Sequence, residues 1–92
     1  MAVEVRCASQ GEGYRCDVDV SQGGSTSHHV VRVAASDLER WGRGRSVDEL
    51  VRASFDFLLA HEPKESILKA FDLSVIKGYF PDYDGYGKMP AL

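Results

Sequence analysis

The sequence lacks a long hydrophobic run: no uninterrupted apolar segment approaches the roughly 18 residues that a membrane-spanning helix needs. The first residues, from Met1 to Arg6, contain no basic start followed by an apolar stretch, so we expect no secretory signal. Positive charge is not in excess either, because the 92 residues carry a formal net charge of −3 at pH 7. This balance argues against general binding to nucleic acid or to a membrane surface.

Cysteine is also scarce, with only Cys7 and Cys16, and these lack the CxxC spacing of a metal site. His28 and His29 are adjacent on an expected strand, so they point to opposite faces and do not chelate one ion together. We expect no metal, no other cofactor and a location in the reducing cytoplasm. There the two cysteines favour buried thiols that pack as small apolar groups, with a redox-sensing disulfide as the alternative.

The composition present is that of one small soluble domain, with 43% hydrophobic and 27% charged residues. We expect a single α+β domain over residues 1–81. Residues 82–92 contain Gly85, Gly87 and Pro90 and show no periodicity, which predicts a flexible or loosely docked C-terminal tail. Tyr83 and Tyr86 of this tail are candidates to dock on the domain.

The first third of the chain alternates between apolar and polar residues, as half-buried strands do. The pattern predicts a three-stranded antiparallel β-meander with one covered face. It places His29 on the face of Val31 and Val33, and His28 on the opposite face, where it can pair with Asp19 across the hairpin. The apolar positions are Val3, Val5, Cys7, Tyr14, Cys16, Val18, Val20, Val30, Val31 and Val33.

The rest of the domain has a helical period. Ser36-Asp37-Leu38-Glu39 and Ser46-Val47-Asp48-Glu49 both fit a capping box, which predicts a short helix and then a long one over residues 47–61. The long helix is broadly apolar, so we expect it at the centre of the fold.

Two further helical segments are expected after Pro63, which can begin a helix at its first position. One carries Ile67, Leu68 and Phe71, and the other carries Leu73, Val75, Ile76 and Tyr79 before Phe80-Pro81 ends it. The fold class is therefore α+β, a three-stranded antiparallel β-meander followed by three or four helices (βββααα).

No dense cluster of chemically competent residues is present, so we expect no catalytic residues. The sequence favours a non-enzymatic binding or regulatory module. The alternative is a small redox or small-molecule enzyme that uses Cys7, Cys16 or the histidines.

The most unusual local feature is Arg40-Trp41-Gly42-Arg43-Gly44-Arg45, with three arginines in six residues before Ser46. These groups could clamp a phosphate at the start of the following helix. Alternatively, this is a mobile loop whose arginines are solvated or paired with Asp48 and Glu49. Trp41 is expected to be a core residue. The candidate binding residues are His28 and Arg32 (with Arg15) on the open sheet face, and Arg40, Arg43, Arg45 and Ser46 in the loop.

From His28 to Ala60 the chain resembles the ribbon-helix-helix family of bacterial repressors and antitoxins. The resemblance is carried by His28-His29-Val30-Val31-Arg32-Val33, Ser36-Asp37-Leu38, Gly44-Arg45-Ser46 and Glu49-Leu50-Val51. It implies an obligate dimer in which His28, Val30 and Arg32 face bases, and Arg45 and the Ser46 backbone face phosphate. The second half, from Leu50 to Tyr83, also resembles small uncharacterised bacterial proteins, which implies a bacterial source and no known activity.

Three kinds of partner therefore stay open: nucleic acid, another protein and a second copy of the chain. For a protein partner, the tail tyrosines and the apolar stripes between Ile67 and Ile76 would complete a core in trans. We expect no membrane partner.

Overall fold

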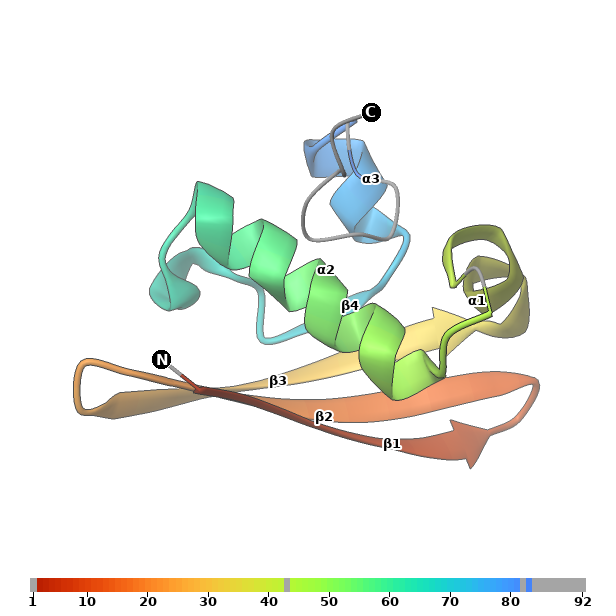
Figure 1. Cartoon of the computed structure of the whole chain (residues 1–92), viewed down its shortest axis with the longest axis horizontal. Helices are drawn as coiled ribbons and strands as arrows, with labels where there is room; N and C mark the ends of the chain where they lie inside the picture. The colour runs from red at the N-terminus through yellow and green to blue at the C-terminus, as the bar shows by residue number, and fades with distance from the viewer. Residues whose placement is uncertain (1, 43, 82, 84–92) are drawn as a thin grey trace.

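The computed structural model describes residues 2–42, 44–81 and 83. Its fold is α+β, with a four-stranded mixed sheet and the helices together on one face of that sheet (Figure 1). No helix in the described part of the chain is long and apolar enough to cross a membrane. The elements are β1 (Ala2–Gln10), β2 (Gly13–Gln22), β3 (Ser25–Ala34), α1 (Ala35–Trp41), α2 (Val47–His61), the 3₁₀ helix η1 (Lys64–Ser66), β4 (Ala70–Asp72) and α3 (Val75–Tyr79).

The predicted antiparallel meander is confirmed by β1, β2 and β3. Gly23 and Gly24 join β2 to β3 with φ angles of 63° and 83°. Glycine adopts such angles without steric cost, which allows the two-residue turn between these strands. Val18 and Val20 of the central strand are fully buried, as the alternation predicts.

The predicted long helix is confirmed with the same bounds, since α2 spans Val47–His61. The Ser46 hydroxyl accepts a hydrogen bond from the Glu49 backbone N–H at 3.2 Å, and Glu49 Oε1 accepts one from the Ser46 backbone N–H at 2.9 Å. Both arms of the capping box are therefore present. Leu50 and Phe55 are fully buried, which places α2 at the centre of the helical layer.

The capping box predicted at Ser36 is wrong, because α1 begins at Ala35 and Ala34 is its N-cap, without a side-chain cap. The chain passes directly from β3 into α1. No extended residue separates the strand from Ser36, so this serine lies inside the first turn. Trp41 at the end of α1 is buried, as predicted.

The helix predicted after Pro63 is also wrong. Only Lys64–Ser66 form a 3₁₀ turn, and Ala70–Asp72 then form β4, which pairs with β3 in parallel. The Val30 N–H donates to the Lys69 carbonyl at 2.7 Å. Backbone groups on this edge of β3 need partners under the helical layer, and the segment after η1 supplies them. The last predicted helical turn is confirmed as α3 (Val75–Tyr79).

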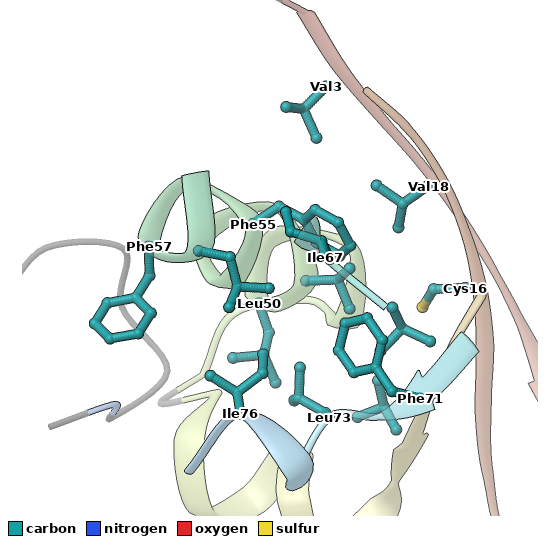
Figure 2. Close-up of a cluster of buried hydrophobic side chains, with 14 of the residues drawn as sticks. Val3, Cys16, Val18, Leu50, Phe55, Phe57, Ile67, Phe71, Leu73 and Ile76 are labelled. Carbon is teal, nitrogen blue, oxygen red and sulfur yellow. The ribbon is translucent and has the colours of Figure 1, made fainter. Parts of the chain in front are cut away.

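The core lies between the inner face of the sheet and the helices. Figure 2 shows Cys16 and Val18 on the inner face of the sheet, where Phe55 of α2 and Phe71 of β4 also lie. Leu73, which follows β4, is fully buried in the same cluster. The parallel strand β4, which the sequence did not predict, therefore contributes directly to the core.

Tyr83 extends this core beyond the predicted boundary at residue 81, because its side chain is fully buried. Its hydroxyl donates to Ser54 Oγ at 2.5 Å, and that serine donates to the Leu50 carbonyl at 2.8 Å. The expected docking of Tyr83 on the domain is thus observed. The other residues of the predicted tail, Tyr86 among them, lie outside the described residues.

Candidate functional site

The two cysteines form a disulfide between β1 and β2, so the favoured prediction of two free thiols is wrong. The register places Cys7 directly opposite Cys16, with Cα atoms 4.0 Å apart, which brings the sulfurs within bonding reach. Cys16 is fully buried on the helix-facing side. Disulfides persist mainly in oxidising compartments, and both the cytoplasmic location and a redox-sensing role stay predictions.

His28 lies on the uncovered face of β3 and its Nδ1 bonds the Asp19 carboxylate, as the alternation predicts. Arg6 Nη2 donates to the other carboxylate oxygen of Asp19 at 2.9 Å. The hydrogen bond from Arg6 and then that from His28 hold the pKa of Asp19 below its usual value of 3.8. Asp19 is therefore charged at neutral pH and offsets the positive charge of Arg6 beside His28.

His29 is buried on the inner face, as predicted, with a 2% exposed surface. Its Nδ1 donates to the Leu68 carbonyl at 2.8 Å, and its Nε2 forms a hydrogen bond with the Ser27 hydroxyl at 2.8 Å. Its ring centroid lies 5.3 Å from that of Phe55. Both ring nitrogens have hydrogen-bond partners, so His29 fixes the segment around Leu68 against the sheet.

The other candidate on the sheet, Arg32, donates from Nε to Asp72 Oδ1 at 2.8 Å and thereby links β3 to β4. Arg15 lies 3.5 Å from the Asp17 carboxylate on the same face. The cations of this open face thus alternate with acidic partners. It is not a continuous basic surface of the kind that binds a phosphate backbone.

In the predicted phosphate clamp, Arg45 donates to the Gly42 carbonyl at 3.0 Å and to the Trp41 carbonyl at 3.1 Å. It therefore caps the C-terminal end of α1. The Arg40 guanidinium lies 5.0 Å from the Trp41 ring centroid, a cation–π distance. Ser46 takes part in the α2 capping box, and Arg43 lies outside the described residues.

The predicted binding residues are not brought together on one surface. His28 and Arg32 are exposed on the uncovered face of β3. The helix α1 lies on the helical side of the sheet (Figure 1). Phosphate binding by either group stays a prediction.

No family model matches the sequence. Neither the curated proteins nor the solved structures contain a match. Function therefore has to be inferred from the chain's own surface.

A groove of about 270 Å³ lies between the C-terminal half of α2, the segment after η1 and α3. Its lining is largely apolar and includes Leu58, Ile67, Leu68, Phe71, Ile76 and Tyr79. Contacts with neighbouring residues hold the lining of this groove in place. The His29 bond positions the Leu68 backbone, and the ring of Phe80 after α3 packs edge-on against Phe57 at 5.5 Å.

Two large apolar side chains at this groove are exposed: Leu68 at 48% and Tyr79 at 69%. Among the described residues, these are the large hydrophobic side chains that stay exposed, and both line the same groove. Glu62 also lines it, partly buried at the end of α2, and its carboxylate makes no ion pair with the part of the chain that the structure describes. The groove thus combines accessible apolar surface with one available negative charge.

The candidate binding residues chosen from the sequence do not include this groove. The sequence did offer a signal, because the apolar positions between Ile67 and Ile76 suggested a surface that could complete a core in trans. As a helix, however, that segment would place Leu68 on the same stripe as Ile67 and Phe71. In the structure this segment is not helical, and Ile67 and Phe71 are buried whereas Leu68 is exposed.

Proposed function

We propose that the protein is a non-enzymatic interaction module whose groove, lined by Leu68 and Tyr79, binds an apolar side chain from a peptide segment of another protein. The observation that carries this proposal is the convergence of the exposed large apolar side chains on a single groove. Clustered exposed apolar side chains are typical of protein interaction sites. Their positions are set by the packed core beneath them, which favours binding to a preformed surface.

The groove also indicates the chemistry of its partner. Its volume of about 270 Å³ suits one or two apolar side chains. Glu62 at the lining favours a lysine or arginine next to the apolar anchor, because an opposite charge would pair with its carboxylate. We therefore expect a partner segment with an apolar residue flanked by a basic one.

The hydrogen bonds that described arginines make within the chain favour this proposal over nucleic-acid binding. Arg32 and Arg45 donate to acceptors within the chain, so a phosphate would have to compete for them. The ribbon-helix-helix resemblance stays a prediction. In that family the strand pairs with its copy, whereas here β3 has β2 on one edge and β4 on the other.

The test is a selection from a phage-displayed library of random peptides, followed by fluorescence polarisation with the selected consensus peptide. We expect enrichment of an apolar residue beside lysine or arginine. Leu68→Glu should lower the affinity for that peptide roughly tenfold or more, because it places a charge where the anchor is buried. Thr26→Glu makes the same charge change at an exposed site of β3 and should leave the affinity unchanged.

Thermal melts of both variants establish that they fold. Glu62→Lys adds a further check, because it should shift the selected peptides from basic to acidic flanking residues. Selected peptides that bind Leu68→Glu as tightly as the unmodified protein would rule out the groove as the binding site. A library that yields no enriched peptide would count against the proposal as well.

A further inference from the structure

The strand β1 forms one edge of the sheet and pairs on one side only among the described residues. This strand has nine residues, and its register with β2 is unbroken from Ala2 to Gln10. It contains no proline, lysine or bulge, which are among the devices that protect an edge strand from pairing. The opposite edge is β4, which has only three residues. The β1 edge is therefore the longer template for strand addition.

The hydrogen bonds between β3 and β4, at the other side of the sheet, establish which backbone N–H and C=O groups of β1 point to its edge. The Val30 N–H bonds the Lys69 carbonyl, and the Leu73 N–H bonds the Arg32 carbonyl, so the backbone groups of Val30 and Arg32 face β4. Along a strand these groups alternate in direction. Val31 therefore faces β2.

The same alternation continues through β2 to β1. Val31 lies opposite Cys16 and its backbone groups face β2, so the backbone groups of Cys16 face β3 and not β1. Cys7 lies opposite Cys16 in the β1–β2 pair, so the backbone groups of Cys7 likewise face away from β2. The N–H and C=O groups of Val3, Val5 and Cys7 therefore point away from β2, to the edge that pairs with no strand among the described residues. Consistent with this direction, the Arg52 guanidinium reaches the Val3 carbonyl at 2.5 Å.

The side chains on the uncovered face of β1 fix how a second copy would pair. Glu4 and Arg6 are exposed there, with 73% and 58% of their side-chain surfaces accessible. When two β1 strands pair antiparallel, residues whose backbone N–H and C=O groups point to the edge must lie opposite residues of the same kind, so that these groups can bond each other. When Val5 lies opposite Val5, Glu4 of each copy faces Arg6 of the other. A shift to the next allowed register in either direction places Glu4 opposite Glu4 or Arg6 opposite Arg6.

We infer that two copies of this chain pair antiparallel through β1, with the two-fold axis at Val5 and two Glu4–Arg6 contacts across it. Such pairing joins the two four-stranded sheets into one and keeps both helical layers on the same face. On pairing, each Val3 carbonyl gives up its hydrogen bond from Arg52 and accepts one from the Cys7 N–H of the second copy. This inference does not depend on the groove.

The experiment is sedimentation velocity over a concentration series. We expect the unmodified protein to dimerise with rising concentration, and Glu4→Arg and Arg6→Glu each to weaken the dimer roughly tenfold or more, because each converts both opposite-charge contacts into like-charge contacts. An equimolar mixture of the two variants should recover the dimer, since each copy then faces the opposite charges on the other.

Glu12→Arg is the matched control, because it makes the same charge change in the β1–β2 turn, and it should leave the dimer unaffected. Leu68→Glu should also leave it intact. Thermal melts establish that each variant folds. A monomer at every concentration would overturn the inference. So would a dimer that persists in both charge variants, or a mixture of those variants that stays monomeric.

Discussion

Tyr83 closes the core after the last helix. Its ring centroid lies 5.2 Å from that of Trp41 and 5.5 Å from that of Phe57, in edge-on contacts. The backbone carbonyl of Tyr83 accepts a hydrogen bond from Lys77 Nζ at 3.0 Å. One residue thus connects α1, α2 and α3, and its buried hydroxyl adds the bond to Ser54.

Tyr83→Phe should lower the free energy of unfolding by about 1 kcal/mol, because the ring contacts stay while a buried hydrogen bond is lost. Tyr79→Phe is the matched control, since Tyr79 is 69% exposed and water replaces any bond of its hydroxyl. Urea denaturation of the two variants measures the difference. Equal stabilities of the two variants would show that the bond to Ser54 adds nothing.

Residue positions on the strands could be predicted, whereas Tyr83 was expected only to dock on the domain and its full burial could not be predicted. The alternation placed His29 inside, and it placed His28 outside beside Asp19; both placements are confirmed. The segment after Pro81 has glycine spacing and no periodicity. Burial of its first tyrosine depends on the pocket formed by Trp41 and Phe57, which only the tertiary fold creates.

At the scale of elements, the β1–β2 hairpin is cross-linked by the Cys7–Cys16 disulfide, with a sequence separation of 9. This bond restricts the unfolded chain. Reduction should therefore lower the free energy of unfolding by about 2–3 kcal/mol by the chain-entropy relation.

Urea denaturation with and without dithiothreitol measures this effect. The double variant Cys7→Ala/Cys16→Ala is the control, and its midpoint should not respond to the reductant. Titratable free thiols in the folded, unreduced protein, together with a midpoint that reductant does not move, would contradict the disulfide and favour the buried-thiol alternative.

Local signals predicted α2 well and β4 not at all. The Ser46–Glu49 capping box and a broad apolar face define α2 within its own residues. Ala70–Asp72 is too short for a recognisable alternation, and it is a strand because β3, distant in sequence, has backbone groups that it can pair with. The spacing of Ile67 and Phe71 also fits a helix, which explains the wrong prediction.

At the scale of the whole molecule, the helices cover one face of the sheet (Figure 1), and the two proposed interaction surfaces are separate from each other. The groove of Leu68 and Tyr79 lies on the helical side, and the β1 edge lies on the far side of β2 from β3. The sequence indicated the groove only as a run of apolar positions. The exposure of Leu68 could not be predicted, because the segment expected to be a helix is irregular at residues 67–69 and then enters β4.

The most direct test of the interaction module is the NMR footprint of the selected peptide on ¹⁵N-labelled protein. We expect the largest amide shift changes at Leu68, Ile76 and Tyr79, with little change along the uncovered sheet face. Largest changes at His28 and Arg32, or at Arg45 and Ser46, would contradict the groove as the binding site and return the interaction to the surfaces first suggested by the sequence.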